Sequence, residues 1–249
     1  MPRFKMLIEF KGTNYCGWQK QPNNVTVEEE IESALSQILQ TPIDIIGQGR
    51  TDSGVHAEGQ VAHFDYPGQL DADRLLFGLL GVLPHDIAVW DLEEVDADFH
   101  ARFDALSRRY RYQIALRPMP LLRSTSLMVL EDLNLDAMRR CAEVITGTHN
   151  FDSFTKPDNE NPDSTCEILQ SGFRLDGSLL TYVIEANRFV RHMVRRLVGT
   201  MLQVGKGKKT VAYFTDLIAS PSKDKNAHGS AAKGLILEAV DYGNDQKSS

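Results

Sequence analysis

The sequence predicts an α+β fold in which two similar halves, residues 1–104 and 105–249, pack around one shared, mainly antiparallel sheet. Strand-like and helix-like segments are mixed without the strict alternation that a parallel sheet requires. The order of these segments is similar in the two halves, and the charge changes between them. Residues 1–104 hold 7 Lys and Arg against 18 Asp and Glu, whereas residues 105–249 hold 20 against 16. The boundary is therefore expected near residue 104.

The first half begins with a strand-like segment and continues with an amphipathic helix. Thr26 is a suitable N-cap for that helix, and the acidic residues of its first turn suit the helix dipole. A glycine-rich turn lies between the next two strands, and a second helix and a further strand follow. The predicted ranges are strands at Lys5–Phe10, Ile43–Ile46, Gln60–Phe64 and Ile87–Leu92, and helices at Val25–Leu39 and Ala72–Leu80.

The second half repeats the mixture of strands and helices. Asp176 and Gly177 join two strands in what reads as a hairpin. The segment Lys156–Pro162 is rich in turn-forming residues and is expected to be an exposed loop, and the polar tail after Gly243 is expected to be loose. The predicted ranges are strands near Arg109–Leu116, Ile168–Leu175 and Leu179–Ala186, and helices near Leu135–Ile145 and Phe189–Val204.

Composition argues against several classes of protein. No stretch of about twenty apolar residues occurs, and the first ten residues alternate like a strand and lack the apolar run of a signal peptide. We therefore expect a cytoplasmic protein that does not enter a membrane. Cys16, Cys141 and Cys166 are widely separated, which predicts reduced thiols and neither a disulfide framework nor a zinc site.

Basic residues are concentrated in one part of an acidic chain. The net charge is −7, yet seven basic and no acidic residues lie between Arg188 and Lys209. Such a run produces a local field that suits phosphate groups, so global acidity does not exclude an RNA ligand. The alternative is an ordinary solvated helix face.

The segment Gly49–Phe64, GRTDSGVHAEGQVAHF, is the most specific in the chain. Glycines lie on both sides of Asp52, which permits a tight backbone and the close approach of a ligand. An Asp in such a turn commonly serves only as a hydrogen-bonding turn residue. The glycine spacing matches neither a Walker loop nor a dinucleotide fingerprint.

This segment resembles, nearly position for position, the catalytic motif of the TruA-type tRNA pseudouridine synthases. Other segments resemble the same family in the same order, over about nine tenths of the chain. These are Phe10–Gln21 (FKGTNYCGWQKQ), Phe99–Ile114 (FHARFDALSRRYRYQI), Asn187–Gly205 (NRFVRHMVRRLVGTMLQVG) and Gly234–Tyr242 (GLILEAVDY). The resemblance implies a pseudouridine synthase fold with a catalytic cleft between the halves. Lys11 departs from the aspartate that the family usually carries in its opening loop.

The resemblance also implies the catalytic residues. Asp52 would be the essential aspartate, a carboxylate that acts as nucleophile or as acid and base without a metal. Arg195 would pair with Asp52 and keep it charged, although it could instead contact phosphate from the basic helix, where Arg188, Arg191 and Arg195 are predicted to lie near one face. Tyr110 would stack on the flipped uracil, whereas periodicity alone describes Tyr110 and Tyr112 as core aromatics on one strand face.

The remaining implied site residues bind the substrate. Leu235 would pack against the base, and Arg50 would help to draw the base from its stack, although they could equally be a core leucine and a salt-bridge residue. Phosphate contacts are expected from five basic residues, and a second basic cluster provides further candidates. The five are Arg188, Arg191, Arg196, Lys206 and Lys208, and the further candidates are Arg108, Arg109 and Arg111.

The activity implied by the resemblance is the isomerisation of uridine to pseudouridine at positions 38, 39 and 40, in the anticodon arm of tRNA. It implies a homodimer that needs no cofactor and no metal. Three alternatives remain at this point: the same scaffold acting on another RNA, an RNA-binding module without chemistry, and a glycoside hydrolase. The last would need paired carboxylates, and none is evident beside Asp52 in the sequence.

Overall fold

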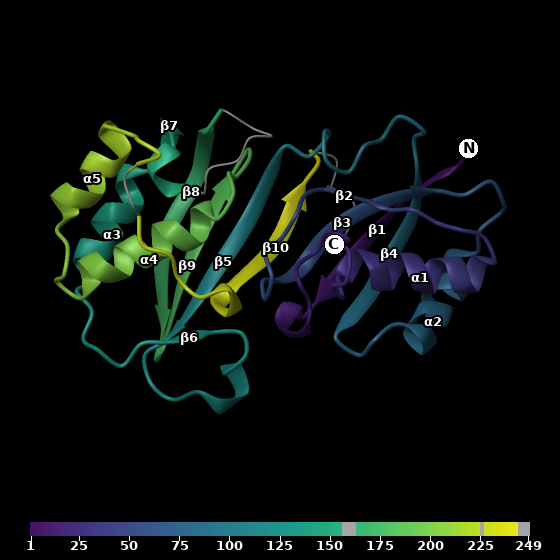
Figure 1. Ribbon diagram of the computed structural model, residues 1–249, viewed down its shortest axis with the longest axis horizontal. Helices are drawn as coiled ribbons and strands as arrows, with labels where there is room; N and C mark the ends of the chain where they lie inside the picture. The colour runs from purple at the N-terminus through teal and green to yellow at the C-terminus, as the bar shows by residue number, and fades with distance from the viewer. Residues whose placement is uncertain (156–162, 225–226, 244–249) are drawn as a thin grey trace. The chain divides into compact units, whose positions relative to one another are not determined.

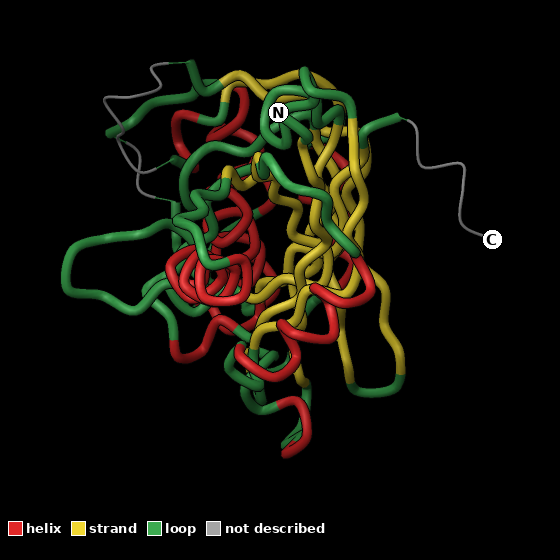
Figure 2. Tube along the Cα trace, turned by 90° about the vertical axis from the view of Figure 1, so that its right-hand side faces the viewer, coloured by secondary structure: helices red, strands yellow, loops and turns green. Residues whose placement is uncertain are grey.

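The computed structural model describes residues 1–155, 163–224 and 227–243. The predicted loop at Lys156–Pro162 and the predicted tail after Gly243 therefore lie outside the described residues. The fold is α+β with mainly antiparallel strands, as predicted (Figure 1). The chain forms two compact units: Met1–Leu106 together with the chain from Ile236 onward, and Ser107–Leu235. Figure 2 distinguishes the helices, in red, from the strands, in yellow.

Unit 1 is built on four long strands with two helices. Strand β1 (Arg3–Phe10) pairs antiparallel with β3 (His56–Asp65) on one side and with β4 (Ile87–Val95) on the other, and the short β2 (Ile46–Gly47) pairs with β3. The last strand, β10 (Leu235–Asp241), runs parallel to β3. The helices are α1 (Val27–Leu39) and α2 (Ala72–Val82).

Both helices of unit 1 begin with a side-chain cap, and Thr26 is the cap that the sequence predicts. The Thr26 hydroxyl accepts a hydrogen bond from the Glu29 N–H, and the Asp71 carboxylate accepts one from the Arg74 N–H. These caps satisfy N–H groups that have no partner within the helix. The apolar faces of the helices are buried, and Ile31, Leu35 and Leu79 are no more than 1% exposed.

Unit 2 is built on an antiparallel sheet with three helices. The strands are β5 (Ser107–Ala115), β9 (Leu179–Ala186), β8 (Thr165–Asp176) and β7 (Gly147–Asn150), in that spatial order, and β6 (Leu127–Met128) runs parallel to β5. The helices are α3 (Leu135–Val144), α4 (Met193–Gly205) and α5 (Val211–Ala219). All three helices lie together on one side of these strands in Figure 1. Short 3-10 turns lie at Gly12–Asn14, Pro120–Leu122, Asp152–Phe154 and Ala232–Gly234.

The structure differs from the sequence-based expectations for one strand, for one helix and for the unit to which the end of the chain belongs. Only Ile46 of the predicted strand Ile43–Ile46 is in a strand, because Ile43 and Ile45 bury their side chains without joining a ladder. The predicted helix Phe189–Val204 begins four residues later, because His192 takes a left-handed φ of 65°. The residues from Ile236 onward belong with the first unit, because β10 pairs with β3.

Candidate functional site

Asp52 lies in the loop between β2 and β3 of unit 1, and its side chain is half-buried. The Val55 N–H donates to the Asp52 carbonyl at 3.1 Å, which closes a tight turn. Gly54 takes a φ of 76° in that turn, a left-handed conformation that favours glycine. The glycine after Asp52 therefore has the backbone role that the sequence predicts.

The opening loop packs directly against the backbone on either side of Asp52. The Trp18 N–H donates to the Thr51 carbonyl at 3.2 Å, and the Ser53 hydroxyl donates to the Tyr15 carbonyl at 3.1 Å. Gly17 has a φ of 96°, and a Cβ there would lie 2.6 Å from the Thr51 carbonyl oxygen. The opening loop thus fixes the backbone that carries the Asp52 side chain.

Gly12 and His56 form a second contact between the opening loop and the start of β3. The Gly12 N–H donates to the His56 Nδ1 atom at 3.0 Å, and His56 is only 4% exposed. A Cβ on Gly12 would lie 1.9 Å from the Val55 carbonyl oxygen. This hydrogen bond, with Nδ1 as the acceptor, fixes the orientation of the His56 ring.

Arg50 is exposed at the entrance to the same loop. The buried Gln60 side chain donates to the Gly49 carbonyl at 3.1 Å, and the Gln48 N–H donates to the Val61 carbonyl at 2.8 Å. These bonds hold the start of the loop on β3. Arg50 and Asp52 therefore lie on one ordered segment of unit 1.

Tyr110 lies on β5 in unit 2, opposite Ile184 of β9, and is half-buried. Its ring meets the edge of the Phe189 ring, with centroids 5.2 Å apart. Tyr112, two residues on, is fully buried, and its hydroxyl donates to the Ala231 carbonyl at 2.8 Å. Burial raises the pKa of Tyr112 to about 12. Of the two tyrosines, Tyr110 is the one that is accessible.

Arg195 lies in the first turn of α4 and is fastened to the segment before β10. Its Nε donates to the Ser230 carbonyl at 3.0 Å, and its own carbonyl accepts from the Ser230 hydroxyl at 2.9 Å. One guanidinium nitrogen also lies 3.4 Å from the His192 Nδ1 atom. The guanidinium is therefore held in a defined position instead of extending into solvent.

Leu235 begins β10 and is 6% exposed. The preceding Gly234 is packed against the Tyr112 ring, since a Cβ on Gly234 would lie 2.7 Å from a ring carbon. The chain from Ser230 to Leu235 is thus attached to Arg195 at one end and to Tyr112 at the other.

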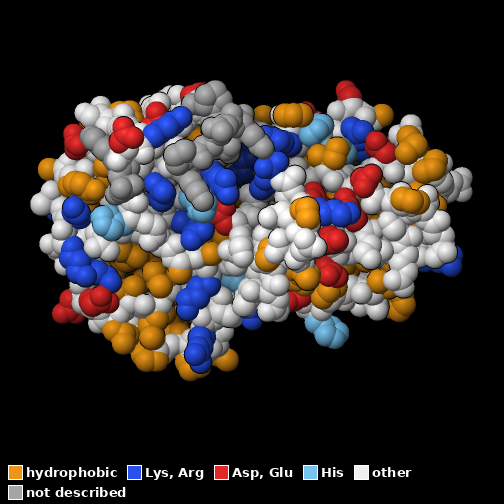
Figure 3. Space-filling view, in the orientation of Figure 1, with side chains coloured by type: hydrophobic (Ala, Val, Ile, Leu, Met, Phe, Trp, Pro, Cys, Tyr) orange, Lys and Arg blue, Asp and Glu red, His pale blue; other side chains and the backbone are white. Residues whose placement is uncertain are grey.

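The predicted phosphate-binding residues differ in their position, their ion pairs and their exposure. Arg188 and Arg191 precede α4, so the predicted helix face that carries Arg188, Arg191 and Arg195 is wrong. Lys206 forms an ion pair with Glu131 at 2.6 Å and Arg109 forms one with Glu185 at 2.7 Å, so both have structural partners. Arg191 and Lys208 are exposed, and Arg188 and Arg196 are partly exposed. Lys and Arg side chains spread over the face that unit 2 presents in Figure 3.

The predicted site residues are divided between the two units. Unit 1 carries Asp52 and Arg50, and unit 2 carries the others. The opening-loop contacts of Gly12, Gly17 and Trp18 were not predicted. The two glycines of GTNYCGW were the available signal, because glycine marks turns and places where another backbone approaches closely.

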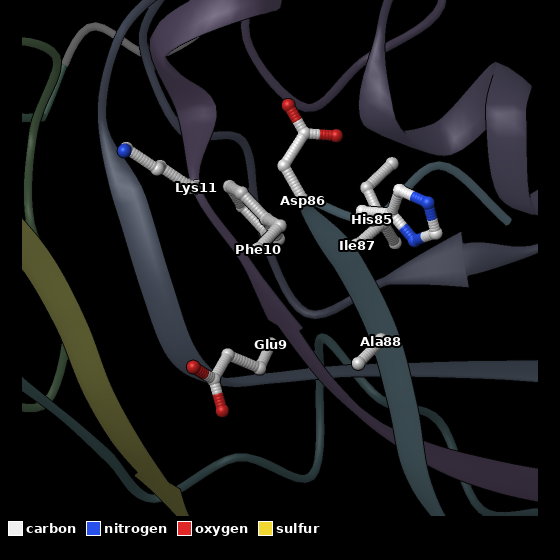
Figure 4. Close-up of a pocket in the computed structure, with 7 residues that line it drawn as sticks. All are labelled: Glu9, Phe10, Lys11, His85, Asp86, Ile87 and Ala88. Atoms are coloured by element: carbon white, nitrogen blue, oxygen red, sulfur yellow. The ribbon is translucent and has the colours of Figure 1, made fainter. Parts of the chain in front are cut away.

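A pocket of about 530 Å³ lies beside the opening loop in unit 1 and contains none of the predicted site residues (Figure 4). Lys11 and His85 lie on opposite sides of it in that view. Asp86, which also lines it, accepts hydrogen bonds from the side chains of Asn14 and Tyr15. Its lining residues are Glu9, Phe10, Lys11, His85, Asp86, Ile87 and Ala88.

Metal-ligating groups, long apolar helices and thiols were the remaining features that the sequence raised. Within the described residues, no three His, Cys, Asp or Glu side chains form a group that could hold a metal ion. No helix in that part of the chain is long and apolar enough to cross a membrane. The three cysteines are free thiols, and burial raises the pKa of Cys141 and Cys166 to about 11, which makes both unreactive.

Comparisons with known proteins agree on one family. The family model described as tRNA pseudouridine synthase matches residues 6–104 and 141–243. The tRNA pseudouridine synthase A of Myxococcus xanthus is 38% identical over 245 residues, which cover 97% of this chain and 92% of that protein. The protein of the same name from Acetivibrio thermocellus is 37% identical over 244 residues, covering 97% of this chain and 100% of that protein. The matched ranges contain Asp52, Arg195 and Leu235 but not Tyr112 or its neighbour Tyr110.

Proposed function

Because this chain belongs to the tRNA pseudouridine synthase family, an isomerase family that acts on tRNA, we propose that it converts uridine to pseudouridine at positions 38, 39 and 40 of the anticodon arm. The observation that carries the proposal is the construction of the Asp52 loop. Two glycine contacts and two hydrogen bonds hold its backbone, which is the preorganisation that a catalytic carboxylate requires.

The reaction needs no redox step. The bond between C1′ of the ribose and N1 of uracil breaks, the base turns, and a bond forms between C1′ and C5. The proton on C5 leaves and N1 gains one, so the atoms balance without a cofactor. Asp52 is the group for this chemistry, either as a nucleophile at C1′ or as a base at C2′.

Arg195 and Tyr110 complete the proposed catalytic set. Arg195 would pair with Asp52 and favour its ionised form, and the bond from its Nε to Ser230 supports a positioned guanidinium. Tyr110 would stack on the uracil, which its partial exposure permits. Leu235 would form the apolar wall of the base pocket.

The remaining proposed residues would contact the RNA outside the target base. The exposed Arg50 would help to draw the uridine from its stack, and Arg188, Arg191 and Arg196 would contact phosphates. We further propose that the enzyme is a cytoplasmic homodimer that works without a metal.

Pseudouridine mapping on unmodified tRNA transcripts tests the proposal, with wild type, Asp52→Asn and Asp44→Asn compared in buffer that contains EDTA. Asp44 is an exposed aspartate of unit 1 and is the matched control. We expect new pseudouridine at positions 38–40 from wild type and Asp44→Asn, and turnover at least about 10³-fold lower in Asp52→Asn, whose tRNA binding stays near wild type.

Two outcomes would contradict the proposal. Product at other nucleotides would indicate the same chemistry on another RNA target. Binding without product in the wild type would indicate an RNA-binding protein without this activity.

A further inference from the structure

A hydrogen-bonded turn between β4 and β5 carries a highly exposed aromatic residue, Phe103. The His100 N–H donates to the Asp104 carboxylate at 2.7 Å, and the Asp104 N–H donates to the His100 carbonyl at 3.0 Å. The His100 Nδ1 atom accepts from the N–H groups of Arg102, at 3.1 Å, and Phe103, at 3.4 Å. The turn is closed by these four bonds, yet Phe103 at its tip is 73% exposed.

Side chains from β1, from β3 and from the residue after β10 hold this turn on unit 1. Arg3 of β1 donates to the Phe99 carbonyl at 2.7 Å, and the His63 Nδ1 atom of β3 accepts from the Ala101 N–H at 3.2 Å. The hydroxyl of Tyr242, just after β10, donates to the Ala101 carbonyl at 2.6 Å. The position of Phe103 is therefore set by the sheet.

Phe103 is the outer ring of a series of aromatic contacts. Its centroid lies 4.3 Å from that of His100 with the planes 39° apart, and His100 lies 5.0 Å from His63, which is 1% exposed. The series thus runs from the interior to the surface. A large aromatic ring that packs on inner rings and is itself exposed to solvent indicates an interaction site.

The chemistry around Phe103 favours a nucleobase as the partner. The Arg102 guanidinium lies 5.7 Å from the centre of the Phe103 ring. An aromatic face beside a cation is the combination with which proteins bind unpaired bases, because the ring stacks on the base while the cation attracts the backbone. We propose that Phe103 is a stacking platform for an unpaired nucleobase of the RNA substrate. This inference rests on the proposed function only in taking tRNA as that RNA.

Binding and kinetics of Phe103 variants test the inference. Phe103→Ala and Phe103→Leu are expected to bind an unmodified tRNA transcript roughly tenfold more weakly than wild type, because neither offers an aromatic face. Phe103→Trp should retain wild-type affinity. Phe77→Ala is the matched control, since Phe77 is also a highly exposed phenylalanine of unit 1, at 80%, but lies on α2 and not in the turn that carries Phe103. The KM should rise in the weak variants while kcat stays near wild type.

The salt dependence of binding separates stacking from phosphate contact. Stacking releases no counterions, so the slope of binding against salt should be the same in Phe103→Ala and wild type. A smaller slope, or wild-type affinity in Phe103→Ala or Phe103→Leu, would overturn the inference. So would a change of oligomeric state in Phe103→Ala, measured by sedimentation, because Phe103 would then face a second copy of the chain.

The test of Phe103 and the test of the proposed function use different measurements, so the two can fail separately. A wild type that binds tRNA but forms no pseudouridine at positions 38–40 refutes that function, while the affinities of the Phe103 variants still decide the role of Phe103.

Discussion

At the scale of single residues, exposure and partners separate side chains that look equivalent in the sequence. Tyr110 and Tyr112 share a strand face, yet Tyr112 is fully buried with its hydroxyl bonded to Ala231, whereas Tyr110 is partly exposed beside Phe189. Burial and a satisfied hydroxyl make Tyr112 a structural residue. Only Tyr110 keeps a surface that a substrate base could reach.

His63 is another residue whose role depends on its surroundings, and it predicts a pH dependence of stability. Burial, together with the charges of Arg3 and His100, lowers the pKa of His63 to about 4, although Asp65 and Asp104 act in the opposite direction. The unfolded chain binds the proton more readily, so the stability from neutral His63 is present above about pH 6.5 and is lost as the pH falls towards 4.

We therefore expect the free energy of unfolding to fall over this range by up to about 1.4 kcal/mol per pH unit from His63 alone. His63→Asn, which can still accept the Ala101 N–H bond, should have a shallower dependence. Urea denaturation between pH 4.5 and 7.5 measures both proteins. Parallel curves for the two would show that His63 does not titrate as described.

At the scale of elements, two loops that are separated in the sequence behave as one structure. The opening loop contributes Gly17 and Trp18, and the catalytic loop contributes Thr51 and Ser53, in contacts that involve mainly backbone atoms. Backbone contacts of this kind tolerate no Cβ, so the geometry around Asp52 depends on glycines in another segment.

Gly17→Ala is predicted to damage the site without touching the Asp52 side chain. The new Cβ would lie 2.6 Å from the Thr51 carbonyl oxygen at a left-handed φ, so the backbone around Asp52 must move. A displacement of about 1 Å of a catalytic group can lower turnover about 100-fold. Single-turnover pseudouridine formation and thermal unfolding measure the effects on activity and on stability.

Gly49→Ala is the control for that substitution. Gly49 lies in the same loop as Asp52, but among the described residues, apart from its two chain neighbours, no atom lies within 4 Å of the position its Cβ would take. Its activity and stability should stay near wild type, with a stability change within about 0.5 kcal/mol. Equal damage from both substitutions would mean that the loop is sensitive to any added methyl group, and not to the Gly17 contact.

At the scale of the whole molecule, charge is divided between the units more sharply than the sequence halves indicate. Because the chain from Ile236 onward belongs to unit 1, Glu238, Asp241 and Asp245 count with the acidic unit. Unit 2 then carries 19 Lys and Arg against 13 Asp and Glu in a protein whose net charge is −7. An RNA phosphate backbone would be attracted to unit 2.

Arg191 and Lys206 lie in the same basic run but are predicted to differ in RNA binding. Arg191→Ala should weaken tRNA binding for every sequence and lower the salt slope by about one, because Arg191 is exposed in front of α4. Lys206→Ala should have a smaller effect, because Lys206 is paired with Glu131 and is 18% exposed. Filter binding at several salt concentrations compares them, and equal slopes would contradict the distinction.

The sequence alone determined the type of most elements and the segment that carries Asp52. Thr26 as a helix cap, the amphipathic pattern of α1, and the hairpin at Gly177, where φ is 55°, all depend on residues a few positions apart. Periodicity, capping and turn chemistry are local, so they can be read without the fold. The family resemblance was also carried by short, ordered segments, and the comparisons confirmed it.

The tertiary structure decided what depends on distant partners. The pairing of β10 with β3 assigned the last strand to unit 1, and the ion pair with Glu131 gave Lys206 a structural partner. The packing of Gly17 on Thr51 joined the opening loop to the loop of Asp52, and the contact of His63 with His100 supported the turn that carries Phe103. Each of these joins residues tens of positions apart, and local sequence patterns carry no information about which distant backbone or side chain will be the neighbour.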